Sequence, residues 1–370
     1  TRSMLPLRSS SGGFSQQRRR RLVRRRRCGQ PLLACMLCCV SATALGTLAS
    51  TRARPALMRA ASSSEGSAGD DAASKAATPP SEQEQERSRP PMLYGTAWKK
   101  ERTTALVVEA IRAGFEGVDT ACQPKHYRED LVGEALLILE ERYHVPRSDV
   151  WIQTKFTPLG GQGPEVPYDV AAPLEDQVAQ SLETSLRHLG RVDSFLLHSP
   201  LRTFEDTMTV WHRFEQAVDD GLVSQIGISN CYNFPFFRRL YDAARVKPKV
   251  LQNRFYAESN YDADLRTFCL EHGVHYQTFW TVSANHHLLT AKHFRYDGGR
   301  EMPNPIALAA DRLKVPPALV LYAWLIRVGH QPLSGTTTHI HANLKCPDLA
   351  NDLSSDEVDQ IARLFPFRGE

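Results

Sequence analysis

The sequence predicts a single (β/α)8 barrel, the TIM-barrel fold in which eight parallel strands alternate with helices. From about residue 91 onward, short apolar runs alternate with longer stretches that are apolar on one face only. Eight such runs fit within about 280 residues, the usual size of one barrel. The competing fold, a doubly wound sheet, usually places a Gly-x-Gly-x-x-Gly loop after its first strand. Here the first run continues as Gly95-Thr-Ala-Trp-Lys-Lys-Glu101, without that loop, so the barrel is favoured.

The expected elements follow this alternation in order. Strands are expected over residues 92–95, 117–119, 150–155, 192–198, 224–228, 250–252, 274–279 and 328–333. Helices are expected over residues 103–113, 131–142, 174–188, 207–220, 236–244, 263–272, 305–313, 319–326, 338–350 and 354–364. The last helix begins with a Ser-x-x-Glu pattern at Ser354 and Glu357, in which each side chain satisfies the other residue's backbone amide.

The N-terminal 60 residues differ from the rest in charge. They contain 13 arginines and no acid, so subtracting them from the net charge of +4 leaves about −9 on residues 61–370. A mildly acidic folded part lacks the basic face that nucleic-acid binding requires, and we expect no nucleic-acid partner.

This N-terminal segment has the layout of a targeting sequence. Arginine runs at 18–21 and 24–27 precede an uncharged stretch over 28–51, and Ala42-Thr-Ala44 offers a small-residue cleavage site. Residues 50–64 are rich in Arg, Ser and Ala, as in organellar transit peptides. We therefore expect bipartite, plastid-type targeting to an organelle. If residues 28–51 are not cleaved, they form a single membrane anchor instead; an artefact of a predicted gene start is a further alternative.

These observations divide the chain into three parts. Residues 1–64 form the targeting or membrane-directing segment, and residues 65–90, dense in Ser, Ala, Glu and Pro, form a disordered linker. Residues 91–370 form the barrel. Membrane contact is expected only through residues 28–51.

Four polar residues follow the ends of neighbouring strands. Asp119 ends the second strand, Tyr127 lies on its loop, Lys155 ends the third strand and His198 ends the fourth. Each alone has a structural explanation, since an Asp can cap a helix and a Tyr can pack. In a barrel, however, these strand ends share one mouth. A Lys ammonium lowers the pKa of a neighbouring phenol, an Asp keeps that Lys charged, and a His orients a carbonyl oxygen. This group suits proton donation to a carbonyl that receives hydride from a cofactor.

The motifs around these residues resemble those of the aldo-keto reductase family. The similar segments are Gly114-Phe-Glu-Gly-Val-Asp-Thr-Ala121, Tyr127-Arg-Glu129 with Val132-Gly133, Thr154-Lys155, His198-Ser-Pro200, Gly221-Leu-Val-Ser-Gln-Ile-Gly-Ile-Ser-Asn230 and Lys247-Pro-Lys-Val-Leu-Gln252. They occur in order over roughly residues 88–370. The resemblance implies a catalytic tetrad of Asp119, Tyr127, Lys155 and His198, with Tyr127 as general acid. It also implies cofactor contacts by Thr96, Ser229, Asn230, Gln252, Phe279, Ser334 and Asn343, and a substrate pocket containing Trp98, Ser199 and Trp280.

The sequence departs from the family pattern near the active site. Tyr127 follows Asp119 by eight residues where the family spacing is five, so its assignment rests on the Tyr-Arg-Glu context. Ser199 stands where many members have Trp, which would enlarge the pocket. The usual Tyr-Ser-Pro-Leu reads Phe279-Trp-Thr-Val282, in which Phe279 can still stack on a nicotinamide.

A further departure concerns the cofactor's 2′-phosphate. Leu333 replaces the Lys, and His339 the Arg, with which the family grips that group. Two charge-assisted contacts, worth roughly 1.5–3 kcal/mol each, are therefore lost or weakened. NADPH is expected by resemblance, with NADH or dual use as an alternative.

The leading functional hypothesis is an NAD(P)H-dependent carbonyl reductase acting on a small aldehyde or ketone, as a monomer by family habit. The alternative is a non-catalytic, nucleotide-binding barrel that senses redox state or regulates a partner.

A metal-dependent hydrolase is suggested only by His286, His287 and His293, which lack clustered carboxylates at the strand ends, and no metal is expected. The cysteines of the barrel (Cys122, Cys231, Cys269 and Cys346) are too far apart for a paired metal site and are expected to be free thiols.

Overall fold

The computed structural model describes residues 89–295 and 299–365. The predicted targeting segment and the linker up to residue 88 lie outside these residues. The described part contains the barrel and the helices around it.

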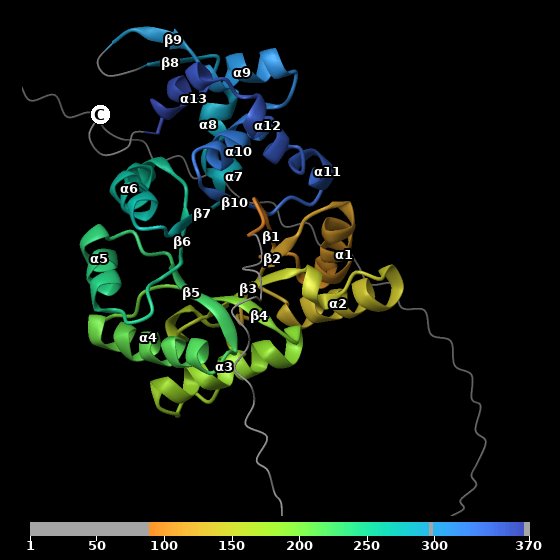
Figure 1. Cartoon of the computed structure of the whole chain (residues 1–370), viewed down its shortest axis with the longest axis vertical. Coiled ribbons are helices and arrows are strands. Elements are labelled where there is room, and N and C mark those ends of the chain that lie inside the picture. Colours follow the sequence, from red (N-terminus) through yellow and green to blue (C-terminus); the bar gives the residue numbers. More distant parts are fainter. Residues whose placement is uncertain (1–88, 296–298, 366–370) are drawn as a thin grey trace, which may run out of the picture. The chain divides into compact units, whose positions relative to one another are not determined.

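Eight parallel strands form a closed barrel in the order β1-β10-β7-β6-β5-β4-β3-β2. They are β1 (Leu93–Gly95), β2 (Gly117–Asp119), β3 (Trp151–Phe156), β4 (Val192–Leu197), β5 (Val223–Ser229), β6 (Val250–Arg254), β7 (His275–Phe279) and β10 (Gln331–Ser334). Figure 1 shows the strands at the centre and the helices outside them. The predicted (β/α)8 barrel is confirmed, and the doubly wound alternative is wrong.

The helices lie where the amphipathic stretches predicted them, with shifted ends. The larger ones are α1 (Thr103–Ala113), α2 (Glu129–Tyr143), α3 (Leu174–Leu189), α4 (Phe204–Asp219), α5 (Phe234–Ala243), α6 (Ala263–Glu271), α9 (Pro305–Leu313), α10 (Pro317–Arg327), α12 (Cys346–Asp352) and α13 (Ser355–Ala362). The predicted capping box at the start of α13 is present: Ser354 Oγ accepts from Glu357 N at 3.2 Å, and Glu357 Oε2 accepts from Ser354 N at 2.9 Å.

The region after β7 departs most from the prediction. Two short helices, α7 (Thr281–Ala284) and α8 (His286–Thr290), and an antiparallel hairpin of β8 (His293–Arg295) and β9 (Glu301–Pro303) precede α9. The single helix expected over 338–350 is instead α11 (Ile340–Asn343) followed by α12. Pro347 explains the break, because proline donates no amide hydrogen and its ring clashes with the carbonyl four residues earlier.

The barrel interior is polar just below the mouth. Gln153 Nε2 donates to Gln277 Oε1 at 2.7 Å, and Gln277 Nε2 donates to Gln331 Oε1 at 2.8 Å, so amides from β3, β7 and β10 bridge the barrel. All three are buried. A satisfied buried network is rigid, and it forms the floor on which the strand-end residues lie.

Candidate active site

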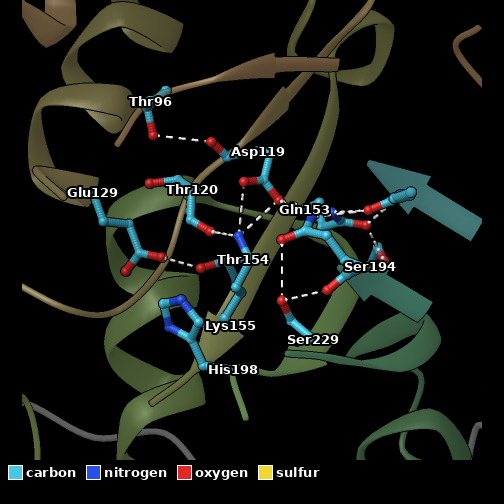
Figure 2. A network of polar contacts seen from close by, with 12 residues as sticks. Thr96, Asp119, Thr120, Glu129, Gln153, Thr154, Lys155, Ser194, His198 and Ser229 are labelled. Carbon is cyan, nitrogen blue, oxygen red and sulfur yellow. Dashed lines mark hydrogen bonds and ion pairs between the residues drawn. The ribbon is translucent and has the colours of Figure 1, made fainter. Parts of the chain in front are cut away.

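The strand ends bring Asp119 and Lys155 into direct contact. Lys155 Nζ donates to Asp119 Oδ1 and Oδ2, each at 2.7 Å, and to the Thr120 carbonyl at 2.7 Å. The Lys155 side chain is 0% exposed and that of Asp119 4%. Figure 2 shows the Lys155 amine below both Asp119 oxygens. The parallel pairing of β2 and β3 brings the two side chains together. Asp119 ends β2 opposite Gln153, and β3 continues past that point to Lys155.

Two amides complete the surroundings of Asp119. Gln153 Nε2 and Gln252 Nε2 donate to Asp119 Oδ1 at 2.7 and 2.9 Å. The carboxylate therefore has one charged and two neutral donors in a buried site. Burial lowers the pKa of Lys155, and the Asp119 charge opposes that shift.

Tyr127 lies above this pair and faces the cavity. Lys155 Nζ lies 5.4 Å from the centroid of the Tyr127 ring, and the phenol hydroxyl has no hydrogen-bond partner among the described residues. Burial, and then the negative charge of Asp119, raise the Tyr127 pKa. The predicted lowering of the Tyr127 pKa is therefore wrong, because burial of the phenol and then the Asp119 charge raise it. The phenol stays protonated, which is the form that donates a proton.

The loop that separates Asp119 from Tyr127 by eight residues is held by hydrogen bonds and a ring contact. Tyr127 N donates to the Gln123 carbonyl at 3.0 Å, and Gln123 Nε2 donates to the Gly161 carbonyl at 2.6 Å. The His126 ring lies against Trp98, with centroids 3.8 Å apart, and Trp98 N donates to the His126 carbonyl at 2.8 Å. The longer loop therefore packs against the β1 loop while Tyr127 keeps its place at the mouth.

The loop is also anchored where α2 begins. Glu129 is buried, accepts a short hydrogen bond from Thr154 on β3, and accepts from Ser185 Oγ of α3 at 3.0 Å. His188 Nδ1 lies 3.4 Å from Glu129 Oε2. These contacts hold the residues that follow Tyr127.

His198 completes the predicted tetrad. Its Nδ1 shares a 2.6 Å hydrogen bond with Thr157 Oγ1, which leaves Nε2 without a partner among the described residues. Its ring centroid lies 5.9 Å from that of Tyr127. Burial, and then the Lys155 ammonium, lower the His198 pKa to about 3. The imidazole is thus neutral at physiological pH and suited to hydrogen-bond an oxygen.

Three of the four tetrad residues border a cavity of about 1040 Å³ at the carboxyl ends of the strands. Its walls include the predicted residues Asp119, Tyr127, His198, Ser229, Asn230, Gln252, Phe279, Asn343, Trp98 and Trp280. The other four predicted residues, Lys155, Thr96, Ser199 and Ser334, do not line it. Thr96 is fully buried and its hydroxyl donates to the Asp119 carbonyl at 2.9 Å, so it joins β1 to β2 rather than facing a cofactor. The roles of the residues in the wall remain predictions.

Polar groups and an aromatic ring lie together at one end of the cavity. Ser229 Oγ donates to the Gln252 carbonyl at 2.8 Å, and Asn230 Nδ2 donates to the His198 carbonyl at 2.9 Å. Asn230 has a φ of 53°, a left-handed conformation that Asn tolerates better than most residues. With Phe279 beside them, these groups fit the carboxamide and the ring of a nicotinamide.

The other end of the cavity suits phosphate, although Leu333 and His339 do replace the expected basic residues. Asn343 Nδ2 donates to Ser334 Oγ at 2.7 Å, and both side chains are buried. Lys99, which sequence reasoning missed, reaches this loop from the loop after β1 and donates to the Gly335 carbonyl. Burial lowers the Lys99 pKa to about 8. Lys99 does not itself line the cavity, but it contacts Gly335, which does.

The histidines that suggested a metal site do not form one. His286 lies in the cavity wall, whereas His293 is exposed in the β8–β9 hairpin. Within residues 89–295 and 299–365, no group of three or more His, Cys, Asp or Glu side chains is placed to hold a metal ion. Over those same ranges, no helix is both long and apolar enough to cross a membrane.

Comparison with known proteins agrees with this geometry. A family model described as the aldo/keto reductase family matches residues 92–365. The glycerol 2-dehydrogenase (NADP(+)) of Hypocrea jecorina is 26% identical over 282 residues, which cover 71% of this chain and 85% of that protein. The NAD/NADP-dependent indole-3-acetaldehyde reductase of Schizosaccharomyces pombe is 27% identical over 269 residues, which cover 70% of this chain and 82% of that protein. The crystal structure of an aldo/keto reductase from Brucella melitensis is similar in fold, with a TM-score of 0.59 at 23% identity. The match covers 74% of this chain and 95% of that one.

Proposed function

Because the chain belongs to the aldo/keto reductase family, as its motifs predicted, we propose that it is an NAD(P)H-dependent carbonyl reductase. It converts an aldehyde or ketone to the alcohol at the mouth of the barrel. The observation that carries the proposal is the Tyr127 hydroxyl, which faces the cavity beside the buried Asp119–Lys155 pair and has no hydrogen-bond partner in residues 89–295 and 299–365.

Each member of the tetrad has a distinct role in this reaction. A bound nicotinamide cofactor would supply the hydride that the side chains cannot. Tyr127 donates its proton to the carbonyl oxygen, and neutral His198 hydrogen-bonds the same oxygen and orients it. The Lys155 ammonium lies close enough to stabilise the phenolate that remains, and Asp119 holds Lys155 in place. Water then returns the proton to Tyr127.

Loss of the Tyr127 hydroxyl tests the reaction. The full chain is expected to consume NADPH with a reactive aromatic aldehyde, and Tyr127→Phe should lower kcat by about 10²- to 10⁴-fold, the usual contribution of a general acid. The variant should fold normally, since the hydroxyl has no hydrogen-bond partner among the described residues. Tyr143→Phe, on α2 outside the cavity, is the matched control. A Tyr127→Phe variant as active as wild type would exclude Tyr127 as the acid, and wild-type protein that binds nucleotide without turnover would favour the non-catalytic alternative.

We also propose NADPH as the cofactor, with Lys99 substituting for the missing Lys and Arg. The two similar proteins above carry NADP or NAD/NADP in their names. Lys99→Met should weaken NADPH binding by about 10- to 100-fold, the loss of one charge-assisted contact. Lys100→Met, at the exposed neighbouring residue, is the control. Fluorescence titration with NADPH and NADH measures both affinities, and unchanged NADPH affinity in Lys99→Met would refute this role.

A further inference from the structure

Arg254 is a cationic residue in the cavity wall that neither the tetrad nor the predicted cofactor contacts include. It ends β6 and pairs in register with Phe279 of β7. Because side chains alternate along a strand, Arg254 faces the same side as Gln252, one layer nearer the mouth. The guanidinium therefore lies beside the polar end of the cavity, near Gln252 and Phe279.

Aromatic rings hold this guanidinium in place. Its central carbon lies 4.2 Å from the ring centroid of Trp280 and 5.2 Å from that of Tyr256. Trp280 adopts a φ of 56°, a strained conformation for a bulky residue, and its side chain remains half exposed. Strain of this kind persists where the surrounding structure requires it, often at ligand sites. The stacking orients the guanidinium at the cavity wall.

Arg254 also lacks a counter-ion in the part of the chain that the structure describes. No acidic residue in the described ranges forms an ion pair with it, and its Nε is buried without a hydrogen-bond partner there. Among the described residues that line the cavity, Asp119 is the sole acid, and Lys155 neutralises it. A stacked arginine without an acidic partner among the described residues, in a cavity without net negative charge, can bind two oxygens of a carboxylate or phosphate with its planar fork of donors.

The position of Arg254 indicates the source of this oxyanion. The proposed phosphate end of the cavity lies beside β1 and β10, where Lys99 contacts Gly335 and Ser334 contacts Asn343. Arg254 lies on β6, and β7 separates it from β10 in the barrel. We propose that Arg254 binds a carboxylate or phosphate group of the substrate, so that this site selects anionic carbonyl compounds. The inference rests on the proposed function and adds its substrate class.

A matched pair of aldehydes tests the charge preference. 4-Carboxybenzaldehyde and its methyl ester share the reacting aldehyde and differ by one negative charge. In the full chain, Arg254→Gln should lower the acid-to-ester ratio of kcat/KM by about 10- to 100-fold. The acid-to-ester ratio of Arg254→Lys should lie between those of wild type and Arg254→Gln, because lysine keeps the charge but lacks the bidentate fork of the guanidinium. Arg238→Gln, an exposed arginine of α5 outside the cavity, should leave the ratio unchanged.

The opposing outcomes are distinct. An unchanged acid-to-ester ratio in Arg254→Gln overturns the proposal. Equal losses on both aldehydes, together with weaker NADPH binding, also overturn it and assign the oxyanion to the cofactor's pyrophosphate. If wild-type protein reduces neither aldehyde, the proposed function fails, and tryptophan fluorescence titration with benzene-1,4-dicarboxylate still tests Arg254 without turnover. Equal affinity of wild type and Arg254→Gln for that dianion refutes the role of Arg254.

Discussion

Replacing Lys155 by Met tests whether the Asp119–Lys155 pair is as buried as its geometry indicates. Methionine nearly fills the space but removes the ammonium that donates to both Asp119 oxygens at 2.7 Å. Removing one partner of a buried ion pair costs about 3–5 kcal/mol, because the other charge remains in a low-dielectric site. Gln153 and Gln252 still donate to Asp119, which offsets part of this cost. The Thr120 carbonyl also loses its Lys155 donor, adding about 1 kcal/mol.

We therefore expect Lys155→Met to lower the free energy of unfolding by about 3–5 kcal/mol. Urea unfolding followed by circular dichroism measures this. The double variant Asp119→Asn/Lys155→Met removes both charges of the pair and should be destabilised by less than the sum of the single variants. A Lys155→Met cost below about 1 kcal/mol, the range of exposed pairs, or strict additivity in the double variant, would refute the reasoning.

Two further predictions concern helix packing and pH. Gly133→Ala should destabilise the protein by about 1–3 kcal/mol in urea unfolding, because an added Cβ would lie 2.1 Å from the His188 carbonyl oxygen where α2 packs on α3. Gly160→Ala, whose Cβ meets nothing within 4 Å, is the control, and equal stability of the two variants would contradict the packing. The pH profile of kcat/KM for aldehyde reduction should show no inflection near the ordinary histidine pKa of about 6.5, because His198, with a pKa of about 3, stays neutral as the pH falls through that range. An inflection near that pH in wild type that disappears in His198→Gln would show that the histidine titrates normally.

The sequence by itself predicted the barrel, which the structure confirms, and the four residues of the proposed tetrad, whose catalytic roles stay predictions. Apolar periodicity locates strands, and in a parallel barrel a strand's last residue is necessarily at the mouth. Asp119, Lys155 and His198 could therefore be placed from their positions at strand ends. Tyr127 needed its Tyr-Arg-Glu context, because a loop of unusual length carries no periodic signal.

Only the tertiary structure decided the electrostatics of the site. The pKa of Tyr127 rises rather than falls, because burial of the phenol raises it and the Asp119 charge adds to the shift. Lys99 reaches the Gly335 carbonyl, 236 residues away, since closing the barrel brings β1 beside β10. Arg254 is likewise free to bind an anion because Trp280 and Tyr256, rather than an acid, pack against it. Sequence spacing reports local periodicity, whereas the charge and exposure of a side chain depend on neighbours that only the folded chain supplies.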